Sequence, residues 1–430
     1  MQKIIISKKL NNSQNFEWQN FIKKINAENV EISNKIQEII TAVKENKDKA
    51  VIDFTNKFDG TKAKKISDLI LEKNTIKNSE KLVSAEIKDS LKLAMKRIVS
   101  YHQKQLPKDF NYTDKSGVKL GNIWKPIEKI GVYVPGGTAS YPSSFLMSVL
   151  PAKCAGVKEI SIFAPSQNGE INPAILYCAK ICEIEKIHLI GGAQAIASMA
   201  YGTESITRVD KIVGPGNSYV AMAKKMLYGE VGIDMIAGPT DITIIADETA
   251  NAKWVAIDSL SQLEHGADSK AFIITNSNDF ANEIIANINQ IAPTLKRFEI
   301  IKKSLKNSAI FVIKDIAEAS VIANYIAPEH LEICTKNSKK ILSAINNAGA
   351  IFLGNYTPEA IGDYMAGPSH TLPTSQTAKF ASGLSVYDFL KRISLISCDQ
   401  KSFKKISKAT SILAKCEGLD AHQLSIDIRQ

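Results

Sequence analysis

The chain has 430 residues, a net charge of +10 and 44% hydrophobic residues. This length exceeds one ordinary hydrophobic core, and the composition is that of a globular protein, so we expect two main domains. The lysines are scattered among acidic residues without a clustered basic stripe, which argues against a nucleic-acid-binding surface. The start of the chain lacks a signal-peptide core and no segment is long enough to span a membrane, so we expect a cytoplasmic protein without a membrane partner.

The periodicity of the apolar residues changes along the chain. Residues 1–29 are polar and predict an N-terminal arm, whereas residues 30–105 repeat apolar residues at helical spacing. From 129 to 246, short β-rich runs alternate with helical stretches, and a second series of the same kind follows. Residues 385–430 predict helices. Strand–helix alternation of this kind predicts parallel, doubly wound α/β sheets.

Three glycine-bearing turns between residues 133 and 217 each lead from a predicted strand into a helix: "VPGG", "IGGAQ" and "VGPGN". Glycine lets the backbone approach a phosphate, and a helix N-terminus offers free N–H groups. None of the turns is a true G-x-G-x-x-G, and tight turns in any α/β sheet also need glycine. The pattern therefore leaves both a nucleotide site and purely structural turns open.

Of the six histidines, four lie past residue 260 in polar surroundings: His265, His330, His370 and His422. In "SQLEHGAD", Gln262 and His265 share a helix face away from the apolar stripe, which by itself fits solvent exposure better than a metal site. Asp363 and His370 stand in a glycine- and proline-rich segment that predicts a shaped loop. Imidazole and carboxylate are groups that Zn²⁺ accepts.

Glu329 and His330 are adjacent, just after a proline that ends the preceding helix. An acid beside an imidazole could activate water and move a proton, or could simply form a polar turn. A zinc hydrolase that uses Glu329 as its base is therefore one alternative, and a metal- or ligand-binding protein without enzymatic activity is another. The six cysteines form no C-x-x-C pair, and we expect Cys178 and Cys182 to serve packing.

Taken together, the motifs resemble those of the histidinol dehydrogenase family. The matching stretches stand in the family's order and cover about 130–422 of this chain: "GVYVPGGTASYPSS", "GGAQAIASMAYGT", "VDKIVGPGNSYVAMAK", "DMIAGPTD", "SQLEHGADS", "APEHLEI", "GDYMAGPSHTLPT", "ASGLSVYDFLKR" and "EGLDAHQLS". The N-terminal third resembles the family in helical texture rather than in motifs.

The resemblance implies a zinc-dependent enzyme that oxidises the small molecule L-histidinol through L-histidinal to L-histidine, using two NAD⁺. Carried over by motif, Glu329 activates water and His330 is the acid and base. The other implied roles are zinc ligation by Gln262, His265, Asp363 and His422; NAD⁺ contacts by Tyr133, Gln194 and Asn217; and substrate contacts by Thr240, His370 and Glu417, alongside the zinc ligands and His330.

The resemblance also implies a fold of two doubly wound, Rossmann-like α/β domains with small N- and C-terminal helical appendages, in an intertwined homodimer. We expect an N-terminal arm (1–29), a first α/β domain (30–132 with 241–384), an NAD-binding domain (133–240) and a tail (385–430) that reaches the partner subunit. In that arrangement Glu417 and His422 complete the partner's active site. One departure is Thr240-Asp241, where the family usually has Ser-Glu; the added methyl and the shorter acid bear on substrate positioning.

Overall fold

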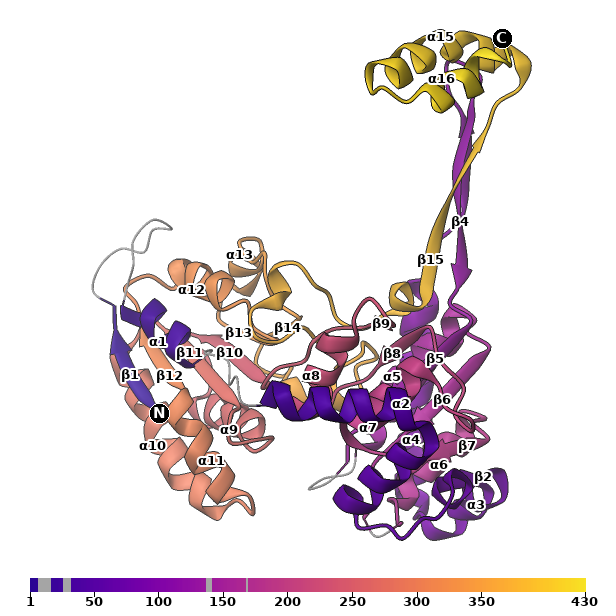
Figure 1. Ribbon diagram of the computed structural model, residues 1–430. Helices are drawn as coiled ribbons and strands as arrows, with labels where there is room; N and C mark the ends of the chain where they lie inside the picture. Colours follow the sequence, from indigo (N-terminus) through magenta and orange to yellow (C-terminus); the bar gives the residue numbers. More distant parts are fainter. Residues whose placement is uncertain (7–16, 26–31, 137–140, 168) are drawn as a thin grey trace.

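A computed structural model describes residues 1–6, 17–25, 32–136, 141–167 and 169–430. Within these residues the chain forms two six-stranded sheets and one three-stranded sheet, with helices packed on the larger two (Figure 1). The prediction of parallel α/β sheets is confirmed. Gly137, the last residue of "VPGG", and part of the predicted N-terminal arm lie outside the described residues.

The first six-stranded sheet has the strand order β2-β7-β6-β5-β8-β9, with every pair parallel except β2–β7. Its strands are β2 (Ile70–Glu72), β5 (Lys129–Tyr133), β6 (Glu159–Phe163), β7 (Lys186–His188), β8 (Lys211–Val213) and β9 (Gly232–Ile233). Helices α4 (Ala85–Lys104), α5 (Pro142–Ala155) and α6 (Pro173–Ile181) share one hydrophobic core with this sheet. Helices α2 (Ile32–Asp59), α7 (Gly192–Tyr201) and α8 (Ser218–Leu227) share another.

The second six-stranded sheet is parallel throughout, in the order β1-β12-β11-β10-β13-β14. Its strands are β1 (Gln2–Ile5), β10 (Asp241–Ala246), β11 (Lys270–Thr275), β12 (Ala309–Val312), β13 (His330–Cys334) and β14 (Ala350–Leu353). The helices of its two cores are α9 (Ala252–Leu263), α10 (Asn278–Ile291) and α11 (Phe298–Ser304) with one, and α1 (Glu17–Ile25), α12 (Ala319–Ile326) and α13 (Ser338–Leu342) with the other. The four central strands are buried along their length, as expected when helices cover both faces.

The third sheet is antiparallel and carries the C-terminal helices away from the rest of the chain (Figure 1). It consists of β3 (Phe110–Thr113), β4 (Lys119–Pro126) and β15 (Leu390–Ser397), and it is followed by α15 (Gln400–Cys416) and α16 (Asp420–Asp427). We call these elements the projecting arm. The strand β15 corrects the expectation of helices throughout 385–430, because its partner β4 comes from a distant part of the sequence.

The N-terminal segments pack on a different sheet from the one that the expected domain boundaries assign to them. Residues 30–132 were expected to group with 241–384, yet α2 and α4 cover the β5 sheet and β5 is one of its central strands. Helical spacing identifies an apolar face but not the sheet that the face covers. Within the expected arm, β1 pairs with β12, and Trp18 of α1 is 2% exposed beside Phe311 and Tyr325.

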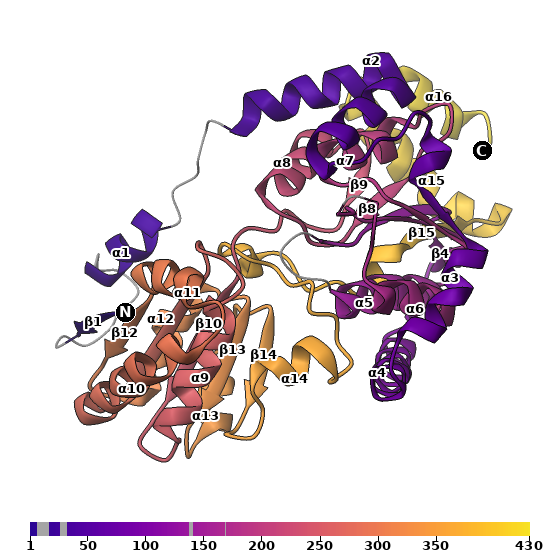
Figure 2. The ribbon, with the colours of Figure 1, turned by 90° about the horizontal axis from the view of Figure 1, so that it is seen from below.

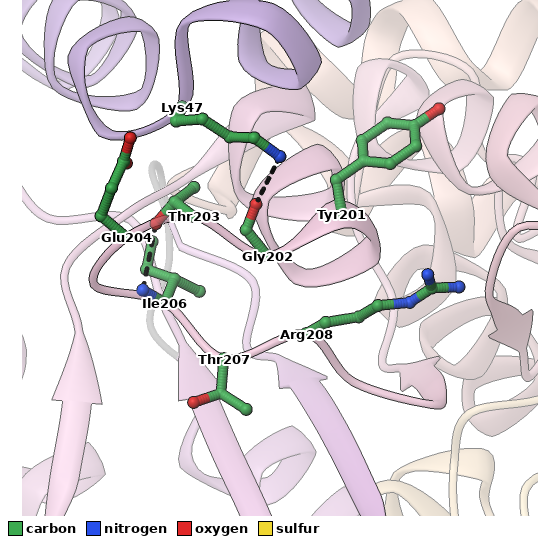
Figure 3. A pocket seen from close by; sticks show the side chains of 8 residues that line it. All are labelled: Lys47, Tyr201, Gly202, Thr203, Glu204, Ile206, Thr207 and Arg208. Carbon is green, nitrogen blue, oxygen red and sulfur yellow. Dashed lines mark hydrogen bonds between the residues drawn. The ribbon is translucent and has the colours of Figure 1, made fainter.

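Helix α2 breaks at Lys47, whose φ is 49°, in the left-handed region. The loop after α7 holds this break: Lys47 donates to Gly202 O at 3.4 Å, and the Asp48 N–H donates to Glu204. A surface hollow of about 450 Å³ lies here, lined by Lys47, Tyr201 and Arg208 among others (Figure 3). Because α7 begins at the "IGGAQ" turn, this hollow lies at the end of the helix away from that turn.

Trp18→Ala is expected to lower the free energy of unfolding by about 3–5 kcal/mol. The substitution removes a buried aromatic side chain from the core that α1, α12 and α13 form on the second six-stranded sheet. Denaturant unfolding followed by circular dichroism measures the loss. Phe380→Ala is the matched control, because Phe380 is 84% exposed. Equal effects of the two substitutions would show that α1 contributes nothing to that core.

Candidate functional site

At the candidate site, the carboxyl ends of the strands of the first large sheet face the amino ends of the strands of the second. Ser144, in the first turn of α5 beyond the carboxyl end of β5, lies 2.9 Å from His370 Nε2. His370 follows α14 (Glu359–Tyr364), a short helix on the side of the β10–β14 strands that faces α5 (Figure 2). Ligands of open α/β sheets usually lie at the carboxyl ends of the strands. The predicted catalytic residues, Glu329 and His330, instead lie at the amino end of β13, beside the amino end of β10.

Glu329 and His330 are held by the first residue of the neighbouring strand, Asp241. The Glu329 N–H donates to the Asp241 carboxylate at 3.1 Å, and the Asp241 N–H donates to Glu329 Oε2 at 3.2 Å. His330 Nδ1 lies 3.2 Å from Asp241 O. A carbonyl oxygen can only accept, so Nδ1 carries the proton and Nε2 keeps a lone pair. Among the described residues this buried Nε2 has no hydrogen-bond partner.

The surroundings of Glu329 and His330 shift their pKa values in opposite directions. Burial raises the pKa of Glu329 well above its ordinary 4.5, and the Asp241 and Asp363 carboxylates add to the rise. Burial lowers the pKa of His330 to about 3, so its imidazole is neutral. A neutral imidazole with a free lone pair can accept a proton, and a carboxylate of raised pKa is a stronger base.

Thr240 links Gln262 to Glu329. The Thr240 hydroxyl donates to Glu329 Oε2 and accepts from Gln262 Nε2. The hydrogen bond from Gln262 Nε2 fixes the orientation of the amide, so that Gln262 Oε1 is directed away from Thr240. Gln262 is 1% exposed, and Oε1 has no partner among the described residues. A buried, unpaired carbonyl oxygen beside acidic and imidazole groups fits a metal ligand.

His265, Glu359 and Asp363 each place one ligand atom within 4.8 Å of the others. His265 follows the C-terminus of α9, and the two carboxylates lie four residues apart on α14. Glu359 is 2% exposed and was not assigned from sequence, although its i, i+4 relation to Asp363 was a signal for a shared helix face. Burial raises the pKa of Asp363 to about 6 and that of Glu359 to about 9, and the Asp363 carboxylate adds to the rise at Glu359.

Both ring nitrogens of His370 have partners within the chain. Nδ1 lies 3.1 Å from the Asp363 backbone oxygen, and Nε2 lies near the Ser144 hydroxyl. Burial lowers the pKa of His370 to about 4. Arg97 of α4 donates to the backbone oxygens of Met365 (2.5 Å) and Ala366 (3.4 Å), at the C-terminus of α14. Helices α4 and α5, which pack on the β5 sheet, therefore hold the loop that carries His370, the predicted substrate contact.

The predicted cofactor residues gather at the carboxyl ends of β5, β7 and β8. Tyr133 is 4% exposed and connects the three turns: its hydroxyl accepts from the Gly192 N–H at 3.1 Å, and a Cβ at Gly214 would lie 2.1 Å from its backbone oxygen. Gln194 is buried, and its amide has no partner among the described residues. Asn217 caps α8 by accepting from Tyr219 and Val220 N–H groups.

Two further acidic residues support these turns. Asp234 accepts from the Gly214 N–H and pairs with Lys224, which donates to Gly214 O at 3.0 Å; the pair is almost fully buried. Asp59, at the end of α2, accepts from the Gly191 N–H at 3.2 Å. Burial raises the pKa of Asp59 to about 6, against that hydrogen bond. Asp234 opens the matching stretch "DMIAGPTD" but was given no role from sequence, and Asp59 had no local signal, since each acts through a contact with a glycine of another segment.

Glu417 and His422 do not join the site within one chain. Both side chains are exposed on the projecting arm, which extends away from the two large sheets (Figure 1). Cys334 lies at the opposite, carboxyl end of β13 from His330, and burial raises the pKa of its thiol to about 12, which makes it a poor nucleophile.

A family model described as histidinol dehydrogenase matches residues 22–430. The chain belongs to the histidinol dehydrogenase family. Histidinol dehydrogenase 1 of Nostoc sp. is 48% identical over 403 residues, which cover 93% of this chain and 92% of the relative. The Neisseria meningitidis serogroup A enzyme is 44% identical over 427 residues, 98% and 99% of the two chains. The solved structure of histidinol dehydrogenase from Elizabethkingia anophelis superposes with a TM-score of 0.93 at 36% identity, covering 100% of this chain and 98% of that one.

The family assignment decides between the functions that the motifs left open. It makes the chain an NAD-dependent oxidoreductase of histidine biosynthesis, which favours the dehydrogenase over the hydrolase and the non-enzymatic binding protein. Among the described residues, no helix has the length and apolar character needed to cross a membrane.

Asp59→Asn is expected to stabilise the protein at pH 8 and to have a smaller effect at pH 5. The folded-state pKa of about 6 lies above the ordinary 3.8, so stability from the protonated carboxyl is complete below 3.8 and is lost as the pH rises through 6. Discounted for partial exposure, the gain at pH 8 is about 1 kcal/mol. Urea unfolding at both pH values measures it.

Asp53→Asn is the control for Asp59→Asn, since Asp53 is an exposed carboxylate of the same helix. It should change stability by less than about 0.5 kcal/mol at either pH. A gain for Asp59→Asn that is equal at pH 5 and pH 8 would contradict the account of the buried carboxyl.

Proposed function

We propose that the chain is a zinc-dependent enzyme that oxidises L-histidinol to L-histidine with two NAD⁺. The zinc ligands are Gln262, His265 and Asp363 of one chain and His422 of a second copy. The observation that carries the metal site is the buried Gln262 Oε1, which Thr240 orients and which lacks a partner among the described residues. The proximity of His265 and Asp363 supports it. When bound, zinc would act as a Lewis acid that holds and orients the substrate.

We assign NAD⁺ to the three turns joined by Tyr133. Burial raises the pKa of Tyr133 to about 12, so its phenol stays neutral. Gln194 and Asn217 flank it on helices α7 and α8, and the N-terminus of a helix favours a pyrophosphate. NAD⁺, when bound, supplies the hydride acceptor for each oxidation. Because Ser144 contacts His370, this edge of the β5 sheet faces the metal residues.

In the first oxidation, His330 removes the proton of the alcohol. Its neutral ring offers the Nε2 lone pair, while Nδ1–H is held by Asp241 O. The substrate carbon loses a hydride to NAD⁺ and the hydroxyl loses a proton to His330, which gives the aldehyde. Thr240, His370 and Glu417 of the second copy are the proposed further substrate contacts, with the metal residues. The Thr240 hydroxyl keeps a hydrogen bond to Glu329.

In the second oxidation, Glu329 takes a proton from water as the water oxygen adds to the aldehyde carbon. His330, protonated in the first oxidation, returns that proton to the former aldehyde oxygen, which completes the hydrate. The hydrate then loses a second hydride to the second NAD⁺ and a proton to the neutral His330, which gives the carboxylic acid. Glu329 is 7% exposed at the junction of β10 and β13, where its carboxylate is anchored by Thr240 and the Asp241 N–H. An anchored base keeps its position relative to the reacting carbon through both steps.

We further propose an intertwined homodimer. The projecting arm exposes apolar side chains to solvent within one chain, among them Ile396 (75%), Leu413 (64%), Leu424 (60%) and Ile428 (70%). Exposed apolar surface of this kind marks an interaction site. The arm also carries His422 and Glu417, so docking on a second copy would bring both to the partner's site. A cytoplasmic location is proposed from the free cysteines, which suit a reducing compartment.

The protein is expected to form two NADH per histidinol consumed, measured by absorbance at 340 nm against histidine formed. Removal of zinc with a chelator should abolish the reaction, and added zinc should restore it. Glu329→Gln should slow the oxidation of histidinal by about 10²–10⁴-fold, because the water base is lost. One NADH per histidinol, or full activity after metal removal, would contradict the proposal.

Mixed dimers test the shared site. His330→Ala and His422→Ala proteins should each be nearly inactive, since one lacks the base and the other a ligand. Unfolded together and refolded, mixed dimers should regain activity, because one of their two sites then has both wild-type residues. Recovery to about a quarter of the wild-type activity is expected from random pairing of chains. The same treatment of His330→Ala with Glu329→Gln is the control, since these residues act in the same chain, and it should give no recovery.

A further inference from the structure

Ser144 is a buried polar residue at the boundary of the two large sheets. It is 3% exposed, in the first turn of α5, and its hydroxyl lies 2.9 Å from His370 Nε2. Helix α5 begins at Pro142, just beyond the strand β5 that ends at Tyr133. The serine therefore belongs to the cofactor side of the site but contacts a residue of the substrate side.

The hydrogen bonds of His370 fix the direction of the bond from Ser144. The Asp363 backbone oxygen, 3.1 Å from Nδ1, can only accept, so Nδ1 carries the ring proton. In a neutral ring Nε2 is then an acceptor, and the Ser144 hydroxyl donates to it. Nδ1 thus bonds to the backbone of Asp363 at the start of the same loop, and Nε2 bonds to Ser144 of α5.

Helix α5 holds the backbone of His370 as well as its ring. The His370 N–H lies 3.3 Å from the sulfur of Met147, three residues after Ser144 on the same helix face. Two contacts from one helix determine both the position and the rotation of the imidazole. A ring held at both nitrogens presents its carbon edge or its face to a neighbouring ligand, rather than a free nitrogen.

We propose that Ser144 is a positioning residue of the substrate site, which acts by holding the His370 ring in place from the cofactor side. This inference rests on the proposed contact between His370 and histidinol. Without the hydroxyl, Nε2 loses its partner in a ring that is 11% exposed, and the ring gains alternative orientations. Substrate binding should suffer more than the chemical step, since His330 and Glu329 are held by separate contacts with Asp241 and Thr240.

Ser144→Ala in the zinc-loaded dimer is the first test. The KM for histidinol should rise about tenfold with kcat within about twofold of the wild type, because a uniform binding interaction is weakened. Zinc content should be unchanged. Ser148→Ala is the matched control: Ser148 is fully buried one turn later in α5, and its hydroxyl has no partner among the described residues. Ser144→Thr, which keeps the hydroxyl, should restore most of the affinity.

The second test observes the ring directly. Solid-state ¹⁵N spectra of protein labelled at histidine report each imidazole nitrogen, and the chain has six histidines. The His370 signals, identified by their loss in His370→Gln, should show an unprotonated Nε2 in the wild type and in Ser148→Ala. Ser144→Ala should shift that signal. The spectrum requires no turnover, so it decides on Ser144 separately from the proposed reaction.

An unchanged His370 spectrum in Ser144→Ala would overturn the inference, even if the KM rises. Equal KM values for Ser144→Ala and Ser148→Ala would overturn it as well. A wild-type protein that forms no NADH from histidinol would instead refute the proposed function, while the ring signal would still decide whether Ser144 holds His370.

Discussion

Unpaired polar atoms buried around the amino ends of β10 and β13 are the main constraint that the rest of the structure has to offset. Gln262 Oε1, His330 Nε2 and Glu359 Oε1 are all buried without a hydrogen-bond partner among the described residues. Each such group costs about 1–3 kcal/mol of stability. The fully buried central strands and the helices on both faces of their sheet offset this cost. A rigid hydrophobic frame therefore holds a set of polar groups that a metal and a substrate can satisfy.

Buried charged groups also occur at the proposed cofactor turns, where they bond to the backbone. Asp59 and the Lys224–Asp234 pair are desolvated in order to fix the backbone of Gly191 and Gly214. Tyr133 then joins the turns into one surface. The two sides meet where α5 and α4 contact the loop after α14, so that the proposed cofactor turns of one sheet face the proposed metal ligands of the other.

The sequence predicted parallel α/β sheets, because alternating strand and helix patterns are local. Gln262 and His265 could be placed on one helix face by spacing alone, but spacing could not distinguish a metal site from solvent. The buried, unpaired Oε1 of Gln262 favours the proposed metal site, and its orientation depends on Thr240, which directly precedes β10. Asp59 and Ser144 could not be assigned from sequence, since their roles arise from contacts between distant segments, whereas Glu359 carried only its i, i+4 relation to Asp363. The strand β15 was missed for the same reason.

The C-terminal residues stand apart from the rest of the site within a single chain. His422 and Glu417 stand exposed on an arm with apolar side chains, whereas the other proposed zinc ligands lie on or just after α9 and on α14, away from the projecting arm. Zinc K-edge X-ray absorption measures the number of imidazoles around the metal directly. We expect two imidazoles per zinc in the wild-type dimer and one in His422→Ala. Two imidazoles in His422→Ala, or one in the wild type, would contradict a metal site shared between two chains.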